Sequence, residues 1–92
     1  MVQKSVAEFF KVPISELRAK KRHKNIVLPR QVAMYLSRQL TNMSFPEIGN
    51  AFGGKDHTTA LYSFKKIEKE MAEVGGEELK TAIRELTTIL KH

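Results

Sequence analysis

Hydrophobic residues recur along this chain at spacings of three and four, which is the period of a helix that buries one face. No stretch alternates apolar and polar residues as a half-buried strand does. Apolar runs such as Ile26 to Leu28 are too short to cross a bilayer. The pattern therefore predicts an all-α fold, a bundle of six helices.

Two helices are expected at the start of the chain. The first covers about residues 2–11 and ends before Pro13, because the residue preceding a proline is displaced from helical geometry. Ser15 is expected to cap a second, short helix that turns Ile14 and Leu17 inward. The apolar stripe of the first helix consists of Val2, Val6, Phe9 and Phe10.

A basic string over residues 18–25 follows and is predicted to be a loop. Pro29 then suits the first turn of a third helix, where its missing N–H is no loss. This long helix is expected to be the central buttress of the bundle. Its recurring apolar positions are Val32, Tyr35, Leu36, Leu40 and Met43.

Two residue patterns mark the start and the end of a short fourth helix. Ser44 and Glu47 have the spacing of a capping box, in which each side chain accepts a hydrogen bond from the other's backbone, and Pro46 lies in the first turn. Gly53 and Gly54 end the helix, because glycine reaches positive φ without steric cost. The face expected to be buried comprises Phe45, Ile48 and Phe52.

The remaining sequence predicts two further helices. Asp56 is the expected N-cap of the fifth, which ends at Gly75 and Gly76. The stripe of this helix comprises Ala60, Leu61, Phe64, Ile67, Met71 and Val74. A sixth helix is expected to begin at Glu77. It should bury Leu79, Ile83, Leu86 and Leu90.

Composition narrows the possible functions. With 92 residues, 41% hydrophobic and 28% charged, the chain fits one ordinary globular domain over residues 2–92. It contains no cysteine, and its three histidines, His23, His57 and His92, are too far apart for a short-spaced zinc pair. Neither a disulfide nor a metal site is expected. The opening residues lack a secretory signal, which favours a cytoplasmic protein without membrane attachment.

The net charge of +6 is unevenly distributed. Residues 1–43 hold nine Lys and Arg against two acids, whereas residues 44–92 hold seven against eight. Such asymmetry in a small domain predicts a polyanionic partner, nucleic acid before membrane, because phosphates return the largest electrostatic gain. A surplus that serves only solubility is the alternative.

Two enzymatic interpretations fail on the residues present. The segment from Gly49 to Lys55 has the spacing of a phosphate-binding loop, but Asp56 stands where such a loop needs Ser or Thr for magnesium, and no strand precedes it. Asp56, His57 and Thr58 offer acid, base and hydroxyl, yet adjacent residues on a helix diverge by about 100° and cannot form a relay. The sequence therefore does not predict an enzyme.

The segment at about residues 45–73 has the organisation of a helix-turn-helix unit, with a short helix, a tight turn and a longer amphipathic helix. In that motif the first turn of the second helix meets base edges, and an Asp, a His and two Thr occupy it here. Asp can accept from cytosine, His can donate to guanine or thymine, and a Thr methyl can pack on a thymine methyl. From the pattern alone, a simple helix cap that binds nothing is an equal alternative.

The sequence from Ile48 to Ile67, IGNAFGGKDHTTALYSFKKI, closely resembles the signature of the DnaA family of bacterial replication initiators, in the C-terminal DNA-binding domain. The resemblance extends upstream through LPRQVAMYLSRQLTNMSFPEIG and QKSVAEFFKV, and it covers about residues 2–70. It implies a helix-turn-helix domain that recognises asymmetric origin boxes written TTATNCACA in duplex DNA. It also implies an ATPase module elsewhere in such proteins, so ATP is expected there and no cofactor in this chain.

The resemblance assigns roles to individual residues. Arg22 takes the minor-groove position, which suits a guanidinium better than an ammonium, and a basic loop acting only through charge is the alternative. The major-groove readers that it implies are Asp56, His57, Thr58 and Thr59, with Phe45 and Pro46 packing on thymine methyls. The positions that it places near phosphates are Lys21, Arg30, Gln31, Arg38, Thr41, Asn42 and Lys55. For Arg30 and Arg38, a solvated face of the buttress helix is an equal alternative.

This chain departs from the family pattern at three positions. Lys55, Tyr62 and Phe45 stand where the family often has Arg, His and Leu. The first departure replaces a planar forked donor by a point charge, which puts a bidentate base contact there in doubt. The larger Phe45 ring can shift the thymine contact.

Two other kinds of protein would need features that do not stand out in this sequence. A free-standing helix-turn-helix regulator, the alternative function, would normally carry a dimer surface to match a palindromic operator. A helical protein-interaction module would need an exposed apolar stripe, whereas every stripe above can be used in one core. We therefore expect a monomer in the nucleoid whose partners are double-stranded DNA and the remainder of a parent initiator chain.

Overall fold

The described part of the chain forms six helices in the order that the apolar spacing predicts. The computed structural model describes residues 1–20 and 23–91, and those residues contain helices and no strand. The all-α prediction is therefore confirmed. The helices are α1 (Val2–Phe10), α2 (Ile14–Leu17), α3 (Lys24–Leu40), α4 (Phe45–Ala51), α5 (His57–Ala72) and α6 (Glu77–Leu90).

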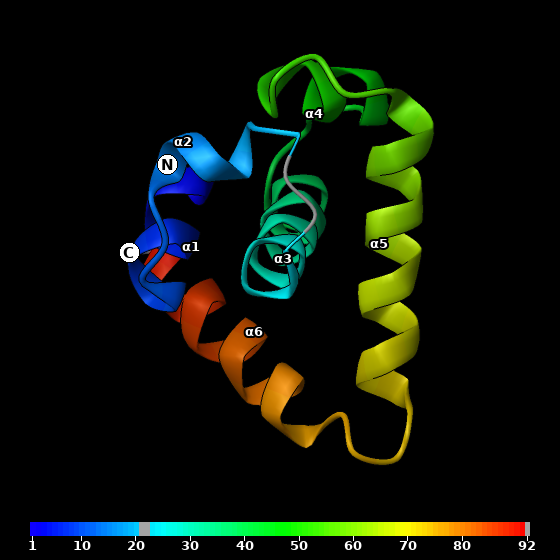
Figure 1. Ribbon diagram of the computed structural model, residues 1–92. Coiled ribbons are helices and arrows are strands. Elements are labelled where there is room, and N and C mark those ends of the chain that lie inside the picture. Colours follow the sequence, from blue (N-terminus) through cyan, green and yellow to red (C-terminus); the bar gives the residue numbers. More distant parts are fainter. Residues whose placement is uncertain (21–22, 92) are drawn as a thin grey trace.

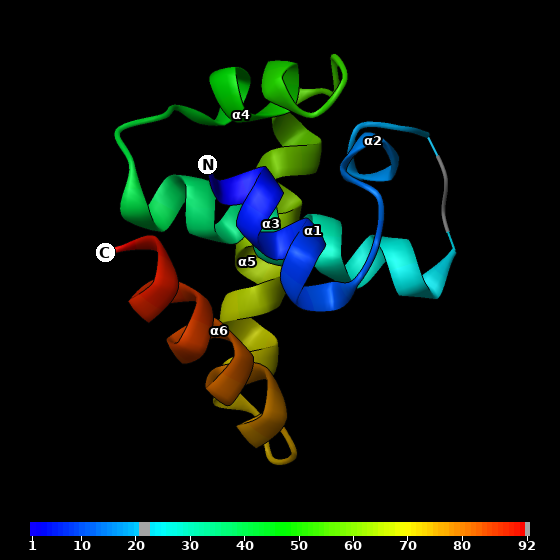
Figure 2. The ribbon, with the colours of Figure 1, turned by 90° about the vertical axis from the view of Figure 1, so that its left-hand side faces the viewer.

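The third helix is the centre of the molecule, as predicted for the buttress. α3 contacts all five other helices, with α1 and α6 on one side of it and α5 on the other (Figure 1). Turned by 90°, the molecule shows α3 lying across α5, with α2 beside the N-terminal half of α3 (Figure 2). The largest fully buried side chains are Phe52, Leu17, Ile26, Met34, Leu36, Ile48, Ile67, Leu86, Val6 and Val32.

The start of α3 differs from the sequence prediction. The helix begins at Lys24, five residues before Pro29, so the end of the basic string is helical rather than loop. His23 is extended and its carbonyl accepts from the N–H groups of Ile26 and Val27, both at 2.9 Å. Because burial of Ile26 fixes this extra turn, the proline lies inside the helix at the cost of one intrahelical hydrogen bond.

The second helix also begins earlier than predicted. Pro13, with φ of −64° and ψ of 137°, is the N-cap, so Ser15 lies inside α2 and does not cap it. Leu17 is buried as expected, but Ile14 remains 39% exposed. A proline that already holds the φ of a helix start explains the earlier boundary.

The end of the fifth helix corrects one predicted core position. Glu73 leaves the helix with an extended ψ of 159°, and Val74, predicted to be buried, is fully exposed. A turn through Gly75, at φ of 92°, then leads into α6 at the predicted residue, Glu77. Leu86 and Ile83 of α6 are buried, whereas Leu79 and Leu90 are partly buried against the core.

The predicted capping box is present at the start of α4. The Ser44 hydroxyl accepts from the Glu47 N–H at 3.2 Å, and the Glu47 carboxylate accepts from the Ser44 N–H at 2.8 Å. The hydrogen bond from the Ser44 backbone, with the Ser44 side chain second, lowers the pKa of Glu47 below its ordinary value.

We expect Glu47→Gln to flatten the acid end of the stability curve. Because the folded-state pKa of Glu47 lies below the unfolded value, its carboxylate contributes stability that is present above the unfolded pKa and is lost as pH falls through the folded pKa. Glutamine preserves a capping acceptor but does not titrate. Thermal unfolding at about pH 6 and about pH 3 should show a smaller drop in Tm for the variant than for the wild type. Equal drops would contradict the prediction.

Candidate DNA interface

The turn between α4 and α5 is tight because two glycines adopt positive φ. Gly53 and Gly54 have φ of 87° and 75°, and the Lys55 N–H donates to the Gly49 carbonyl at 2.8 Å. A Cβ added at Gly49 would lie 2.2 Å from the Lys55 carbonyl oxygen. The backbone of the turn is therefore packed directly on α4, which fixes the direction in which α5 starts.

The first turn of α5 is capped and exposed at the same time. Asp56 accepts from the Thr58 N–H at 3.2 Å, and its carboxylate also lies 3.0 Å from His57 Nδ1. The N–H of Thr58 is the main cause that lowers the pKa of Asp56, so this carboxylate is charged at neutral pH. Asp56 and the three residues after it are all exposed. Asp56 therefore caps α5 and, like the next three residues, is also exposed as a residue that contacts base edges must be.

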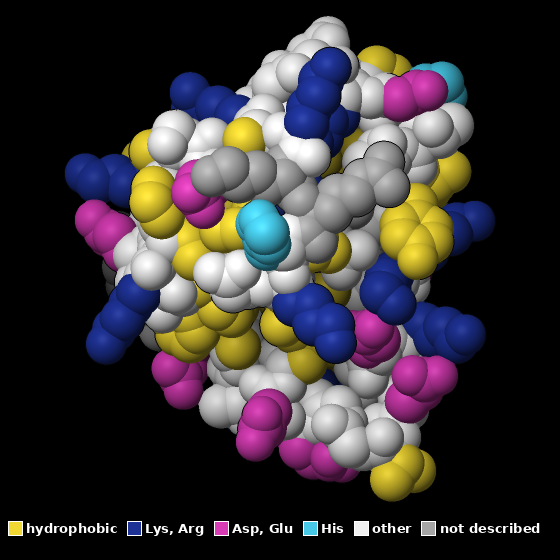
Figure 3. Space-filling view, viewed as in Figure 1, with side chains coloured by type: hydrophobic (Ala, Val, Ile, Leu, Met, Phe, Trp, Pro, Cys, Tyr) yellow, Lys and Arg dark blue, Asp and Glu magenta, His cyan; other side chains and the backbone are white. Residues whose placement is uncertain are grey.

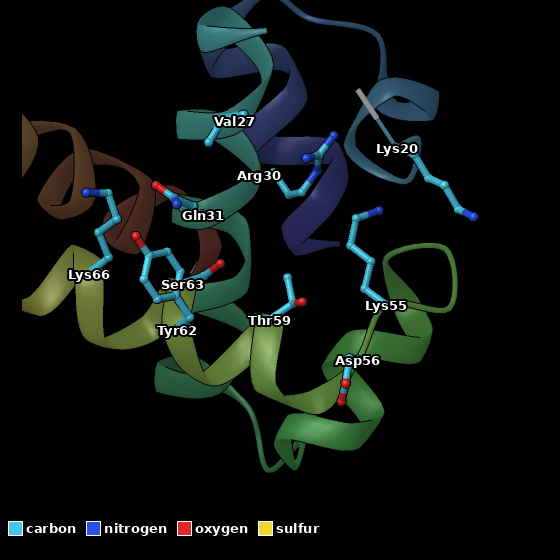
Figure 4. Close-up of a pocket in the computed structure, with 10 residues that line it drawn as sticks. All are labelled: Lys20, Val27, Arg30, Gln31, Lys55, Asp56, Thr59, Tyr62, Ser63 and Lys66. Carbon is cyan, nitrogen blue, oxygen red and sulfur yellow. The ribbon is translucent and has the colours of Figure 1, made fainter. Parts of the chain in front are cut away.

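A cleft of about 650 Å³ opens beside this turn. Figure 4 shows side chains from α3 on one wall, side chains from α5 on the other, and Lys20 and Lys55 at one end. The residues that line it are Lys20, Val27, Arg30, Gln31, Lys55, Asp56, Thr59, Tyr62, Ser63 and Lys66. Four of these side chains are cationic, so the cleft has the charge to accept an anionic backbone.

The residues placed near phosphates fall into two groups in the structure. Arg30, Gln31 and Lys55 line the cleft together with two of the predicted base readers. Arg30 and Gln31 are each only 8% exposed, which excludes the solvated-face alternative for Arg30.

The second group lies where α3 passes into α4. The Arg38 guanidinium donates to the Met43 carbonyl at 3.0 Å and lies 4.8 Å from the centre of the Phe45 ring. The Thr41 hydroxyl donates to the Ser37 carbonyl and accepts from the Met43 N–H. Asn42 and Pro46 are exposed nearby in the chain. None of this group lines the cleft, and Lys21 and Arg22 lie outside the described residues.

The sequence prediction missed several residues of the cleft. Tyr62 is 60% exposed, and it lines the cleft with Thr59 and Lys66. These three residues recur at spacings of three and four on α5, so counting along the helix from Thr59 identifies this wall. On α3 the same spacing of four relates Val27 to Gln31. Lys20 could not be found in this way, because its position depends on how α2 packs.

Charge differs between the two ends of the molecule. Acidic side chains gather over the end where α5 turns into α6 (Figure 3). The acids in this part of the sequence are Glu68, Glu70, Glu73, Glu77 and Glu78. Such a distribution orients the start of α5, with Lys20 and Lys55 beside it, toward a polyanion.

The described part of the chain carries neither a metal-ligand cluster nor a membrane-spanning helix. Over residues 1–20 and 23–91, no cluster of His, Asp and Glu is placed to hold a metal ion. Within the same ranges, none of the helices has both the length and the apolarity needed to cross a membrane.

Comparison with known proteins finds the same motif in relatives. Residues 1–67 match the family described as "Bacterial dnaA protein helix-turn-helix". The chain is 52% identical over 86 residues to the chromosomal replication initiator protein DnaA of Geobacter sp. strain M21, covering 94% of this chain and 18% of that protein. It is 48% identical over 91 residues to the protein of that name from Lactobacillus acidophilus, covering 99% of this chain and 20% of that protein. The chain therefore spans about a fifth of the length of these relatives.

Proposed function

The chain belongs to the bacterial DnaA helix-turn-helix family, and from this premise we propose that it binds duplex DNA at origin boxes of the type TTATNCACA. Binding would position an initiator for chromosomal replication. The observation that carries the proposal is the first turn of α5, which is capped, exposed and adjacent to a cleft lined by four cationic side chains.

The chemistry of this turn suits direct readout in the major groove. Asp56 offers an acceptor for cytosine N4, and His57 offers a donor for guanine or thymine oxygens. The methyl groups of Thr58 and Thr59 can pack on thymine methyls. The apolar pair Phe45 and Pro46, at the start of α4, would contribute a further thymine contact.

Contacts to the DNA backbone would come from residues of α3 and of the α3–α4 junction, which flank the first turn of α5. Gln31 in the cleft, with Arg38 and Asn42 at the α3–α4 junction, offers side-chain hydrogen-bond donors for phosphate oxygens. The hydroxyl of Thr41 would have to release the Ser37 carbonyl before it could donate to a phosphate. Lys21 and Arg22 follow Lys20 in the sequence, and Arg22 is proposed to enter the adjacent minor groove. The domain would act as one monomer per asymmetric box, with the rest of a parent initiator chain as its protein partner.

Fluorescence anisotropy with two duplexes tests this function. One duplex carries the box and the other carries the same bases in scrambled order, so both have the same charge. We expect the box to bind at least about tenfold more tightly at equal salt, because specific sites exceed non-specific ones by large factors. Equal affinities would show that the domain does not read sequence.

Salt should weaken binding to both duplexes. The basic first half of the chain should neutralise several phosphates and release their counterions. We therefore expect the logarithm of the affinity to fall linearly with the logarithm of the salt concentration, by about 0.9 per phosphate neutralised. A salt titration from about 50 to 200 mM measures this slope. An affinity for the box that is independent of salt would contradict the prediction.

A further inference from the structure

The end of α2 is held mainly by side chains of other elements. α2 has four residues, and the carbonyls of Ser15 and Glu16 accept from the N–H groups of Arg18 and Ala19, while the carbonyls that follow point beyond the helix. A helix this short is also unstable by itself. The segment 16–19 must therefore be held by contacts with other elements, and the basic string follows directly after it.

Arg30 supplies the first of these contacts, from α3. Its Nε donates to the Leu17 carbonyl at 3.0 Å, and its Nη2 donates to the carbonyls of Glu16 at 3.1 Å and Ala19 at 3.0 Å. The side chain is almost fully buried while doing so. A planar fork that reaches three backbone oxygens fixes both the position and the orientation of this segment.

Lys55 supplies the second contact, from the turn of the helix-turn-helix. Its ammonium donates to the carbonyls of Arg18 at 3.1 Å and Ala19 at 3.0 Å, and to the Phe52 carbonyl in its own turn at 2.7 Å. Three acceptors match the three N–H donors of an ammonium. Lys55 therefore joins the end of α2 to the turn that precedes α5.

The backbone of the turn between α4 and α5 also packs closely against the end of α2. A Cβ added at Gly53 would lie 2.1 Å from the Arg18 carbonyl oxygen. The Arg18 Nε also donates to the Gln3 side chain at 2.8 Å, and Gln3 donates to the Ala51 carbonyl at 2.8 Å. The end of α2 is thus fixed to α4 and to the turn at several points.

The Arg30 guanidinium and the Lys55 ammonium lie close together although both are positively charged, since both donate to the Ala19 carbonyl. Burial lowers the pKa of Lys55, and the positive charges of Arg30 and Lys20 lower it further. Burial also lowers the pKa of Arg30. The carbonyl dipoles at the end of a helix offset this repulsion, since that end carries partial negative charge. Figure 4 shows Arg30 and Lys55 approaching the same region from the two sides.

We propose that Arg30 and Lys55 form a carbonyl clamp, defined by these two side chains and the carbonyls of residues 16–19, that sets where the start of the basic string, residues 18–20, lies relative to α5. The inference rests on the proposed function. It assigns to both residues a positioning role in place of phosphate contact, because the Lys55 ammonium and the Nε and Nη2 atoms of Arg30 already donate to protein carbonyls. The preference for the box would then depend on the clamp, since α5 and the basic string must contact the same box at a fixed distance from each other.

Lys55→Met and Lys66→Met form a matched pair that tests the clamp. Each removes one cation from a wall of the cleft and retains an apolar stem. Lys66 pairs with Glu70 at 3.0 Å and contacts no carbonyl of the clamp. Both variants are measured against the box and its scrambled copy, with thermal melts to confirm folding.

For Lys55→Met we expect the ratio of box to scrambled affinity to fall about tenfold, the effect of one misread base pair. For Lys66→Met we expect both duplexes to weaken by a similar factor and the ratio to remain. Lys55→Arg should restore the ratio, because a guanidinium can donate to the same carbonyls. If Lys55→Met, like Lys66→Met, weakens binding to both duplexes by the same factor and leaves the ratio of affinities unchanged, the clamp is overturned.

Hydrogen exchange in the free protein provides a readout without DNA. The N–H groups of Arg18 and Ala19 donate to carbonyls within α2 at 3.2 and 3.3 Å. Their exchange should speed up in Lys55→Met and stay unchanged in Lys66→Met. Unchanged exchange in Lys55→Met would overturn the clamp, whereas a wild-type protein that does not prefer the box would refute only the proposed function.

Arg30→Lys provides a second variant should Lys55→Met not fold. It retains the net charge but removes the planar fork. A positioning role predicts a lower ratio of box to scrambled affinity with an unchanged salt slope. If Arg30→Lys keeps the wild-type ratio, the clamp does not set the register.

Discussion

Gly53→Ala should destabilise the folded protein by at least about 3 kcal/mol, whereas Gly54→Ala should cost about 1–2 kcal/mol. Both glycines have positive φ, so both substitutions carry the strain of a left-handed alanine. Only at Gly53 would the new Cβ also meet backbone, 2.1 Å from the Arg18 carbonyl oxygen. At Gly54 nothing lies within 4 Å.

The pair therefore separates backbone strain from the contact between the turn and α2. Urea unfolding of both variants measures the free energy of unfolding directly. Equal losses at the two positions would show that α2 is not held against the turn in solution. A larger loss at Gly53 than at Gly54 would support the close approach on which the carbonyl clamp depends.

Substitution of Asp56 or His57 should reduce affinity for the box by about 1–3 kcal/mol each, with little effect on scrambled DNA. These residues offer an acceptor and a donor to base edges, and scrambled duplex presents the wrong partners. Removing the Asp56 carboxylate also relieves repulsion from phosphates, so non-specific binding should stay equal or become tighter.

The role of Asp56 as an N-cap requires a control. Asp56→Asn retains a capping acceptor of similar quality but loses the charge that faces the groove. Anisotropy titrations of folded Asp56→Asn and His57→Ala proteins against both duplexes give the ratio of affinities. If both variants keep the wild-type ratio, the first turn of α5 is not the reader.

Features set by neighbouring residues in the chain were predictable from the sequence. The number of helices, the Ser44 capping box and the Asp56 N-cap follow from helical spacing and from short-range hydrogen bonds. The candidate reader was predictable for the same reason, because its residues adjoin in one turn.

Features set by packing between helices were not predictable. α3 starts at Lys24 because Ile26 is buried, and nothing near Pro29 in the sequence shows this. The surroundings of Lys55 depend on carbonyls 36 and 37 residues away, so the sequence did not show that its ammonium donates to the end of α2. Arg30 is buried because α3 is surrounded by other helices, which an amphipathic pattern does not reveal.

Mapping the DNA-binding surface by NMR tests the central claim most directly. Titration of the labelled protein with box duplex should shift the backbone amides of residues 56–59 and of Gln31 and Tyr62 most strongly, with saturation at one protein per duplex. Scrambled duplex should produce smaller shifts that spread over the basic surface, and α6 should change little with either. Shifts centred on α6, or identical shifts with both duplexes, would contradict sequence readout by the first turn of α5.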